Sequence, residues 1–586
     1  MATNDPVDTD VLVVGAGPAG LTASALLARH GVAAVTVSRY PGTANSPRAH
    51  ITNQRTVEVF RDLGIEDRVR AVATPNRLMG NNVWATSFAG EEIARLRSWG
   101  TGVDRAADYA AASPCSMCNA PQHLLEPLLL DRARELGAEI RFSTELVDLT
   151  QDASGVTGTV RERETGREYT IRARYAIGAD GARSLVAERC GFAFDGEAGL
   201  GAALNMWLEV DLSRYTEHRP GVLYWTAQPG NSYWVGSGTW ICVRPWSEWV
   251  LLCMYDPADG EPDVSTEAVT ARARATIGDP GAEIRVKNVS KWQINHMVAR
   301  EYRRGRVFLA GDAAHRHPPA NGLGSNTSIQ DAWNLSWKLA LVLAGQAGEA
   351  LLDTYHAERQ PVGRRVVDRA MKSVQDMAPI PDALGFRHGQ SAEDGWASLR
   401  ELFSDAPGAT ERRARLEQAV ALQHYQFNAH GVELDQRYRS AAIADDGSPF
   451  PEPTRDPELY HHPTTHPGAA LPHAWLQHGI ERVSTLDLAG HGRFALLVGI
   501  GGEPWAAAAA KLAEELGVEL PVHSVGYRCA YDDVLGEWRR RREVGDRGAL
   551  LVRPDRYVAW RAPDLPTAGT PEDALRTALR TALCLS

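Results

Sequence analysis

The sequence predicts an α/β fold with an N-terminal strand-helix-strand unit, a central antiparallel sheet and a separate C-terminal α/β unit. The first unit is indicated by a buried-strand run at Asp10–Val14, helical apolar spacing over Pro18–His30 and a second strand run at Val32–Ser38. Strand follows strand in Leu204–Tyr255, and beyond Gly468 strands and helices alternate again. A chain of 586 residues has room for three or four domains of about 150 residues each.

Local signals place the remaining elements in chain order. In the first part of the chain we expect helices over Pro121–Gly137 and Thr327–Ala344, strands at Ala138–Phe142, Tyr175–Gly178 and Val307–Ala310, and a hairpin around Glu164–Arg167. After Val374 the signals weaken, and the polar, Pro-rich stretch Gly447–Pro457 is expected to be a linker. In the C-terminal unit we expect strands at Phe494–Val498 and Leu520–Gly526, helices over Trp505–Leu516, Asp532–Val544 and Pro571–Leu583, and a hairpin over Ala549–Trp560.

Tryptophans gather in the central strand region. Six of the sixteen in the chain fall there, which indicates a sheet with an aromatic face that could form pocket walls or plain core. They are Trp207, Trp225, Trp234, Trp240, Trp246 and Trp249.

The charge balance and the cysteine count exclude several classes of protein. The formal net charge is −11, which disfavours a nucleic-acid or anionic-membrane partner because both bind basic surfaces. The first ten residues hold no Lys or Arg, so we expect no secretory signal, and glycines and a proline interrupt the uncharged run Val11–Ala28, so we expect no membrane span. Seven thinly spread cysteines do not resemble a disulfide framework, and we expect a cytoplasmic protein.

A glycine-rich turn joins the first strand to the first helix. Gly15, Gly17 and Gly20 form a GxGxxG pattern, in which the glycines permit a tight turn and the helix N-terminus offers unpaired N–H groups to a pyrophosphate. This context predicts a Rossmann-like dinucleotide-binding domain. The second strand ends in Ser38-Arg39 where an acidic residue usually holds the ribose, which favours NADP in a dehydrogenase but does not separate NADP from FAD.

Two later motifs separate these cofactors. The stretch Gly178–Ser184 (GADGARS) resembles the DG motif of single-component flavin monooxygenases, and Gly311–His315 (GDAAH), continued by Pro318–Asn326, resembles their GD motif and flavin loop. Ser46–Thr56 and Arg244–Trp246 (RPW) narrow the resemblance to the phenol hydroxylase and dichlorophenol monooxygenase group. The resemblance covers essentially the whole chain.

The resemblance implies an α/β architecture in which a Rossmann-like FAD-binding domain is interlaced with an antiparallel-sheet substrate domain and followed by a thioredoxin-like domain. It also implies bound FAD, NADPH as electron donor with NADH as the alternative, and O2 as co-substrate. The first strand-to-helix turn of the last domain, Gly499–Trp505, holds no cysteine, so we expect that domain to serve homo-oligomer assembly and not redox chemistry. The implied boundaries are 1–185 and 296–373 for FAD binding, with 75–120 partly on the substrate side, 186–295 for the substrate domain, 374–467 for a linker and helical region, and 468–586 for the thioredoxin-like domain.

The resemblance also implies a set of cofactor-binding residues. Asp312 can accept hydrogen bonds from the ribityl hydroxyls, and backbone N–H groups of Gly322–Asn326 can stabilise negative charge on reduced flavin. Arg39 is expected along the adenosine. The set is Gly15, Gly17, Gly20, Arg39, Arg48, Gln122, Asp180, Gly311, Asp312, Pro319, Gly322, Gly324 and Asn326.

His50 and Arg244 are the residues expected to act on the substrate. A phenol titrates at about pH 10, so a positioned base must take its proton to make the ring electron-rich. Histidine suits this task, and the resemblance implies a His or an acid at this position. The alternative for His50 is a structural histidine bonded to the backbone. Arg244 can stabilise a phenolate or steer the substrate, and its alternative is a surface arginine at a strand end.

Three other patterns favour ordinary structure over a metal or redox site. Cys115 and Cys118 have CxxC spacing, but no second such pair completes a zinc site, so we expect two ordinary thiols. His461–His466 (HHPTTH) lies in a Pro-bearing stretch without a Cys or acid cluster, so we expect no metal there. Arg539–Arg542 is expected to be a solvated or subunit-facing surface.

Together these observations predict an FAD- and NADPH-dependent monooxygenase. The resemblance implies that a C4a-hydroperoxyflavin hydroxylates a small phenol-like ring ortho to an existing hydroxyl. A flavin-dependent halogenase is the competing enzyme, although the Trp-x-Trp-x-Ile-Pro stretch of that class is absent from the sequence. A non-catalytic flavin-binding assembly protein is the alternative from a different class. A simple phenol, a hydroxypyridine and a polyketide ring all remain open as substrates, in degradation or in natural-product tailoring.

Overall fold

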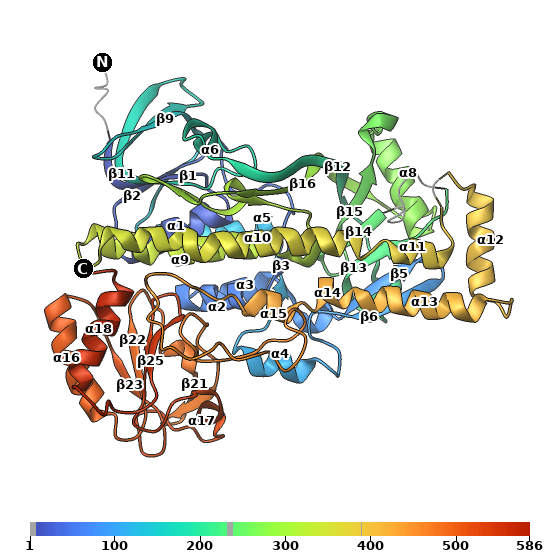
Figure 1. The fold of residues 1–586 in the computed structure, drawn as a ribbon. Helices are drawn as coiled ribbons and strands as arrows, with labels where there is room; N and C mark the ends of the chain where they lie inside the picture. The colour runs from blue at the N-terminus through green and yellow to red at the C-terminus, as the bar shows by residue number, and fades with distance from the viewer. Residues whose placement is uncertain (1–6, 231–237, 388, 586) are drawn as a thin grey trace.

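The computed structural model describes residues 7–230, 238–387 and 389–585. Over these residues the chain forms two eight-stranded sheets, a four-stranded sheet in its C-terminal part and two smaller sheets. Figure 1 shows the two large sheets at opposite ends of a layer of long helices, with the C-terminal part on the other side of that layer. Within the described ranges, no helix combines the length and the apolar character that crossing a membrane requires.

The first large sheet contains the predicted strand-helix-strand unit. In order across the sheet its strands are β17 (Arg303–Arg304), β18 (Val307–Leu309), β11 (Glu168–Gly178), β1 (Val7–Val14), β2 (Ala34–Val37) and β8 (Glu139–Arg141), with β10 (Val156–Glu162) and β9 (Thr144–Gln151) continuing from β11. The strands from β18 to β8 run parallel. Because β1 lies between β2 and the later β11, the strand order reverses at β1. Ligands of such sheets bind outside the carboxyl ends of the strands at this point.

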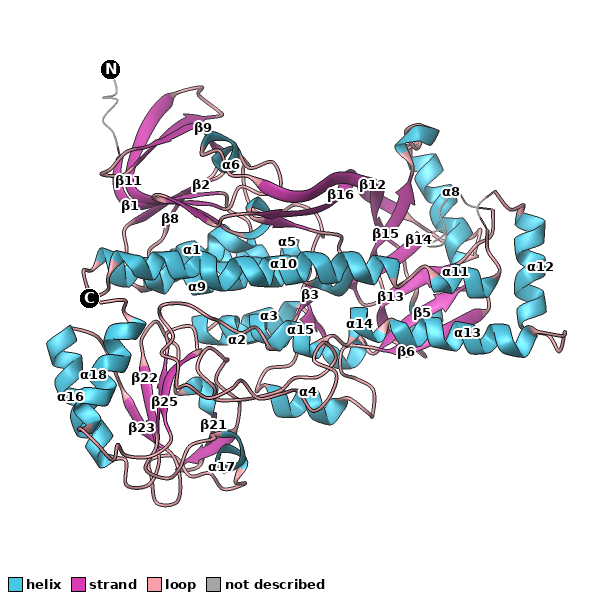
Figure 2. Cartoon of the chain, in the orientation of Figure 1, coloured by secondary structure: helices cyan, strands magenta, loops and turns pink. Residues whose placement is uncertain are grey.

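Long helices run beside this sheet (Figure 2), and α1 and α9 begin directly at predicted flavin motifs. They are α1 (Pro18–Arg29), α2 (Gln54–Leu63), α5 (Gln122–Glu135), α9 (Gly324–Leu343) and α10 (Asp353–Gln375). Helix α1 packs against α5 and α9, and α9 also contacts α2 and α10. Helices α5 and α9 confirm the predicted helices within a few residues, whereas α10 was not predicted.

The second large sheet contains the tryptophan-rich strands. In order its strands are β19 (His315–Arg316), β16 (Arg285–Ala299), β12 (Phe194–Glu209), β15 (Glu248–Tyr255), β14 (Gly238–Arg244), β13 (Gly221–Thr226), β5 (Asn81–Ala85) and β6 (Glu92–Arg97). Its described neighbours are antiparallel except β13 and β5, which are parallel. The long strands β12 and β16 run between the two large sheets (Figure 1). Trp234 lies outside the described residues.

Shorter elements join these layers. A small sheet of β3 (Ile51–Thr52), β7 (Cys118–Asn119) and β4 (Thr74–Pro75) links three separate parts of the chain beside His50. The short helices of this half are α3 (Glu66–Val72), α4 (Ala106–Ala112), α6 (Leu185–Arg189), α7 (Ser213–Thr216) and α8 (Thr266–Ile277).

The region after α10 is helical at first and then irregular. Its helices are α11 (Pro379–Leu384), α12 (Ala392–Leu402), α13 (Ala409–Leu422), α14 (His424–Phe427) and α15 (His430–Leu434). No helix or strand is described from there to β20 (Trp475–His478), so the stretch Gly447–Pro457 is irregular as predicted.

The C-terminal part follows the predicted alternation. After the hairpin of β20 and β21 (Glu481–Ser484), the main sheet has the order β23 (Val522–Ser524), β22 (Ala495–Val498), β24 (Ala549–Val552) and β25 (Val558–Ala562). Strands β22 and β23 are parallel and the other pairs antiparallel. Its helices are α16 (Glu503–Leu516), α17 (Glu537–Arg541) and α18 (Pro571–Ala582).

One predicted helix of this part is too long. The local spacing predicts a helix over Asp532–Val544, but over this stretch the structure has only α17. Gly536 before α17 adopts a left-handed conformation, and Glu543 after it has φ 53°. Asp532 instead pairs with Gln477 of β20. Tertiary pairing with the hairpin therefore overrides the local helical spacing.

Candidate active site

The glycine turn after β1 is closed on two sides by backbone and open on a third. Gly15 has φ +108°, and a Cβ there would lie 2.1 Å from the carbonyl oxygen of Ala179. A Cβ on Gly20 would lie 1.9 Å from the carbonyl oxygen of Gly15. At Gly17, the N-cap of α1, the nearest atom to such a Cβ is 4.0 Å away, and no side chain caps the helix. The first N–H groups of α1 therefore face a space of the kind that a pyrophosphate fills.

A buried carboxylate lies beside this turn. Glu126 on α5 accepts hydrogen bonds from the backbone N–H of Ala44 (2.5 Å) and from the side-chain amide of Gln122 (2.6 Å). Burial raises the pKa of Glu126, because the ionised carboxyl is poorly solvated there. The Gln122 side chain, predicted to contact the flavin, is thus held at the edge of the turn by Glu126.

The DG motif closes the turn from its other side. The Asp180 carboxylate accepts hydrogen bonds from the Ser184 hydroxyl (2.5 Å) and from the backbone N–H of Val186 (3.1 Å), at the start of α6. Burial raises the pKa of Asp180. Asp180 therefore shapes the backbone that carries Ala179, and its predicted contact with FAD stays a prediction.

A second buried carboxylate, on helix α9, holds the turn that follows β18. Asp331 on α9 accepts hydrogen bonds from the backbone N–H of Gly311 (3.0 Å), from Nε2 of His315 (2.8 Å) and from Nε of Arg359 (2.8 Å). Although burial opposes ionisation, the charge of Arg359 and these hydrogen bonds lower the pKa of Asp331. Asp312 of the same turn is exposed, so its carboxylate is accessible to the ribityl hydroxyls predicted for it.

The flavin loop before α9 is tied to the strand that follows His50. The side-chain amide of Asn326 donates to the carbonyl oxygens of Ile51 (2.9 Å) and Gly322 (2.6 Å), and its oxygen accepts from the backbone N–H of Asn53 (3.0 Å). Gly322 has φ +65°, and a Cβ there would lie 2.8 Å from the Cβ of Ile51. Loop and strand β3 therefore form one packed unit.

The groups around this loop fit a bound flavin. Nδ1 of His317 donates to the carbonyl oxygen of Pro318 (2.6 Å), which leaves Nε2 as a buried acceptor without a partner among the described residues. Burial lowers the pKa of His317 to about 4, so the ring is neutral. The buried Oδ1 of Asn321 also lacks a partner, and α9 begins at Gly324 without a side-chain cap. Hydroxyl and N–H groups of a flavin would satisfy these acceptors.

His50, directly before β3, has a fixed tautomer. The Asn119 amide donates through Nδ2 to the carbonyl oxygen of Cys242 (2.9 Å), so its Oδ1 faces the ring and accepts from Nδ1 of His50 (2.8 Å). Nε2 of His50 consequently carries the lone pair. Burial lowers the pKa of His50 to about 4, so the imidazole is neutral at pH 7. His50 is held by a side chain and not by the backbone, and its Nε2 can accept a proton.

Arg244 lies at the end of β14 with partners on neighbouring strands. Its Nε forms an ion pair with Glu248 (3.0 Å), which also accepts a hydrogen bond from Nζ of Lys287 (2.6 Å). The Arg244 side chain is 55% exposed, so the guanidinium is accessible to an anionic ligand. Lys287 lies 4.0 Å from the ring centre of Trp207, which packs edge-on against His123. The role predicted for Arg244 stays a prediction.

The structure brings the predicted flavin residues into two neighbouring groups. Gly15, Gly17, Gly20 and Gln122 surround the start of α1, and Gly311, Gly322, Gly324 and Asn326 surround the start of α9. A Cβ on Gly311 would lie 3.3 Å from that of Ala19, so the groups meet. The side chains of three further predicted contacts, Arg39, Arg48 and Pro319, are exposed, and their contact with FAD stays a prediction.

Several residues of the site carry no local signal in the sequence. Asp331 and Arg359 sit within helices where charged residues usually face solvent. No local motif marks Asn119 or Glu126. The fold brings Asn119 to His50 and Glu126 to the glycine turn. His315, by contrast, lies inside the GDAAH motif.

Most tryptophans of the second sheet form core. Trp240 and Trp249 are fully buried and pack edge-on around Phe88. Trp84 and Trp225 stack with their ring centres 6.3 Å apart. Trp207 is the tryptophan that joins the surroundings of Arg244.

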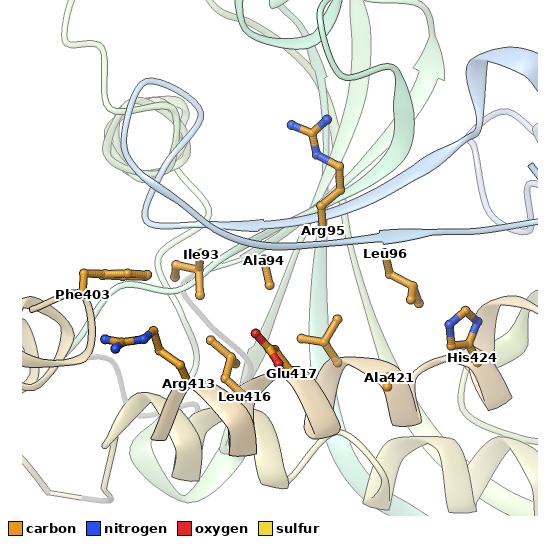
Figure 3. Close-up of a pocket in the computed structure, with 11 residues that line it drawn as sticks. Ile93, Ala94, Arg95, Leu96, Phe403, Arg413, Leu416, Glu417, Ala421 and His424 are labelled. Atoms are coloured by element: carbon orange, nitrogen blue, oxygen red, sulfur yellow. The ribbon is translucent and has the colours of Figure 1, made fainter. Parts of the chain in front are cut away.

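A cavity of about 410 Å³ lies outside this site, between the edge strand β6 and helix α13. Figure 3 shows Arg95 pointing away from it and Glu417 and Leu416 rising toward the strand. None of its lining residues is a predicted flavin or substrate residue. The lining is Ile93, Ala94, Arg95, Leu96, Phe403, Arg413, Leu416, Glu417, Val420, Ala421 and His424.

The CxxC and histidine-rich patterns have structural surroundings. Cys115 and Cys118 are buried free thiols, and burial raises the pKa of both, that of Cys118 to about 12. Nδ1 of His461 lies 2.5 Å from Asp435, whose other oxygen accepts from the backbone N–H of His462 (2.9 Å). In the part of the chain that the structure describes, no group of His, Cys, Asp and Glu is arranged to hold a metal ion.

Two family models match the chain. The model described as FAD binding domain matches residues 8–370, and the model described as aromatic-ring hydroxylase, C-terminal, matches residues 464–584. The first model spans both groups of predicted flavin residues, and the second spans the C-terminal sheet.

Similar proteins are found over nearly the whole length. The chain is 48% identical over 578 residues to 2,4-dichlorophenol 6-monooxygenase of Delftia acidovorans, covering 98% of each protein. It is 36% identical to tetracenomycin A2 monooxygenase-dioxygenase of Streptomyces glaucescens, covering 98% of this chain and 96% of the relative. A crystal structure of the flavin-dependent monooxygenase PieE in complex with FAD and substrate superposes with TM-score 0.95 at 50% identity, over 99% of this chain and 100% of that one.

Proposed function

The chain belongs to the FAD-dependent aromatic-ring hydroxylases, and from this membership we propose that it hydroxylates a phenol-like ring ortho to an existing hydroxyl. NADPH is the proposed electron donor, NADH the alternative, and O2 the co-substrate. When bound, FAD would supply the redox chemistry, namely reduction by the nicotinamide and activation of O2, with one oxygen atom going to the ring and the other to water. The relatives are named monooxygenases, which favours hydroxylation over the halogenase and assembly-protein alternatives.

The lone pair on Nε2 of His50 is the observation that carries the proposal. Asn119 fixes the proton on Nδ1, and burial keeps the ring neutral, so Nε2 is ready to accept the proton of a substrate hydroxyl. The resulting phenolate has a more electron-rich ring, which favours attack by an electrophilic oxygen. Arg244 is proposed to attract the phenolate toward this base.

The two glycine turns and the flavin loop are proposed to hold FAD. The N–H groups at the start of α1 would bind the pyrophosphate, Asp312 the ribityl chain, and the start of α9 the negative end of the reduced ring. Arg39, Arg48, Gln122 and Pro319 are proposed as further contacts around the same groove. Because Ile51 packs on Gly322, His50 lies next in the chain to a residue of the loop that would hold the flavin ring.

A small phenol is the substrate class that we propose first. The relative at 48% identity is named for 2,4-dichlorophenol, whereas the relative at 36% identity is named for tetracenomycin A2. The greater similarity therefore favours a simple halogenated or alkylated phenol over a polycyclic one. A hydroxypyridine remains the third class to test.

The domain organisation is proposed on the strand orders. An FAD-binding domain of 1–185 and 296–373, a substrate domain of 186–295 and a C-terminal domain of 468–586 are supported by the three main sheets. The C-terminal order β23-β22-β24-β25, with one parallel pair and helices α16 and α18 beside it, supports a thioredoxin-like fold. The cytoplasmic location and the homo-oligomer stay predictions from the sequence.

Reconstitution with FAD tests the function. The purified protein is expected to be yellow, to oxidise NADPH faster when a phenol is added, and to release a catechol-type product. A panel of phenols, hydroxypyridines and polycyclic phenols, assayed with and without halide, separates the substrate classes and the halogenase alternative. A colourless protein that oxidises no NADPH after addition of FAD and the whole panel would overturn the proposal.

Substitution of His50 tests the base. His50→Ala should lower the hydroxylation rate by about a hundredfold to ten-thousandfold at pH 7 while leaving FAD binding unchanged. The loss should shrink with more acidic phenols and at higher pH, because those substrates ionise without help. His218→Ala, an exposed histidine, is the control. An equal loss with every phenol at every pH would show that His50 has another role.

A further inference from the structure

The turn between β24 and β25 carries charged side chains that are completely buried. The exposed fractions of Arg553, Asp555 and Arg556 are 0%, 1% and 0%. Hairpin turns normally lie at the surface, and charged residues are almost never fully buried unless they are paired. This turn therefore inserts into the rest of the molecule, and its partners reveal what it holds.

Arg553 holds helix α10 by a two-pronged ion pair. Its two terminal nitrogens donate to the two carboxylate oxygens of Glu358, at 2.6 and 2.8 Å. Glu358 also accepts from Nζ of Lys338 (2.7 Å) and from the amide of Asn334 (2.7 Å), both on α9. Asp555 accepts from the same Asn334 (3.1 Å). The turn thus fixes α9 and α10 to each other at one point.

Arg556 extends the contact to the N-terminal helices. It donates to the carbonyl oxygen of Glu58 (3.0 Å) and to the carboxylate of Asp62 (3.2 Å), both on α2. Asp62 is also paired with Arg29 (2.6 Å) at the end of α1, the helix that starts at the glycine turn. One hairpin turn of the C-terminal unit is therefore linked to α1, α2, α9 and α10.

The next residue along α10 reaches the flavin-binding turn. Glu358 is followed by Arg359, whose Nε donates to Asp331 (2.8 Å), and Asp331 accepts the backbone N–H of Gly311 (3.0 Å). Glu358, Arg359 and Asp331 are fully buried, in an interior that is densely packed. A shift of α10 at Glu358 is therefore passed to the turn Gly311–Ala314.

We infer that the turn Arg553–Arg556 is a positioning element for the cofactor: by holding Glu358 it fixes Arg359 and Asp331, and so sets how tightly the Gly311 turn binds FAD. The inference rests on FAD occupying the site proposed above. Buried ion pairs add little net stability compared with apolar packing, but a two-pronged arginine pair has a strict geometry. Such a strict geometry suits an element that positions its neighbours.

Arg553→Lys tests the inference because it keeps the positive charge but loses the two-pronged ion pair with Glu358. The apoprotein variant should bind FAD about tenfold more weakly, within the range typical of coupling between distant sites. The reduction potential and the visible circular dichroism of the bound flavin should change, and KM for the phenol should not. Arg547→Lys is the matched control, since Arg547 of the same unit pairs with Asp564 at the surface. It should match the parent in each measurement.

The outcomes distinguish a role of Arg553 in positioning the FAD site from a role in the stability of the fold alone. An Arg553→Lys protein that is folded by far-ultraviolet circular dichroism and binds FAD like the parent overturns the inference, even if its urea midpoint falls. If Arg553→Lys does not fold, Ser440→Ala decides, because Ser440 donates to the same Glu358 (2.7 Å) from outside the turn. It should weaken FAD binding about threefold, and unchanged binding overturns the inference. Since the readout is FAD binding, a parent that binds FAD but hydroxylates nothing defeats the proposed function alone.

Discussion

The two glycine-bearing turns of the proposed flavin site are held by different means. The turn at Gly15–Gly20 is fixed by backbone against backbone: Gly15 fits under the carbonyl of Ala179, and Gly20 under that of Gly15. The turn at Gly311 is fixed by charge, through Asp331 and the buried Arg359 behind it. The two turns are neighbours, since a Cβ on Gly311 would lie 3.3 Å from that of Ala19 at the start of α1.

The difference shows what each turn depends on. A turn closed by backbone needs only local glycines, so its geometry is set within a few residues of the chain. A turn closed by a buried ion pair depends on α9, α10 and, through Glu358, on the C-terminal unit. Local substitutions should therefore damage the first turn, while remote ones should damage the second.

Asp331→Ala should have the largest effect. It leaves the Arg359 guanidinium buried without its carboxylate, which costs about 3–5 kcal/mol for a buried pair. Urea unfolding should show that loss, and the purified protein should contain little FAD by absorbance. The double variant Asp331→Ala with Arg359→Met removes both charges and should recover part of the stability. A single variant as stable as the parent would mean that charge does not hold this turn.

Gly20→Ala should damage the backbone-closed turn without altering any charge. The new Cβ would meet the carbonyl oxygen of Gly15 at 1.9 Å, and overpacking of this kind costs about 1–3 kcal/mol. We expect the variant to fold but to retain no FAD after desalting. Gly281→Ala, outside the site, is the control, because Gly281 has no positive φ and the nearest atom to its Cβ would be the Asp279 carboxylate at 3.4 Å. Retention of FAD by Gly20→Ala would contradict the backbone account.

The sequence predicts the first turn well and the second only in part. The GxGxxG spacing specifies a backbone geometry, so it predicts the strand, the turn and the helix together. The GD motif locates Gly311 and Asp312, but Asp331 reaches the turn from α9, 20 residues further on, and Arg359 lies still later, on α10. Their role follows from packing that no local pattern encodes.

The same limit applies to His50 and to the C-terminal unit. The resemblance singles out His50, yet its tautomer depends on Asn119, which β7 brings beside it. The predicted strands and most helices of the C-terminal part are confirmed, because amphipathic spacing is local. The predicted helix over Asp532–Val544 is wrong because this stretch pairs with the β20 hairpin instead. The burial of Arg553 could not be predicted, because the local sequence is that of an ordinary turn.

A fall in pH should weaken the turn at Gly311 but strengthen FAD binding at the turn Gly15–Gly20. Glu126→Gln tests the second effect, which should be the smaller of the two. The pKa of Asp331 is lowered, so its contribution to stability is complete above its unfolded value of 3.8 and is lost only as the pH falls below that. Burial raises the pKa of Glu126, so its ionised form opposes folding and anion binding as the pH rises above the ordinary 4.5. FAD binding by the parent should therefore weaken with rising pH.

Glu126→Gln keeps an acceptor for Ala44 and removes the charge beside the start of α1. It should tighten FAD binding about threefold to tenfold at pH 8, as expected for one partly screened charge near a phosphate, and should flatten the pH dependence. Fluorescence titration of the apoprotein with FAD between about pH 5 and about pH 8 measures this effect. Glu135→Gln, exposed at the end of the same helix, should behave as the parent. A Glu126→Gln protein with the parent's affinity and pH profile would place the pyrophosphate away from Glu126, and the open face of the glycine turn would then need another occupant.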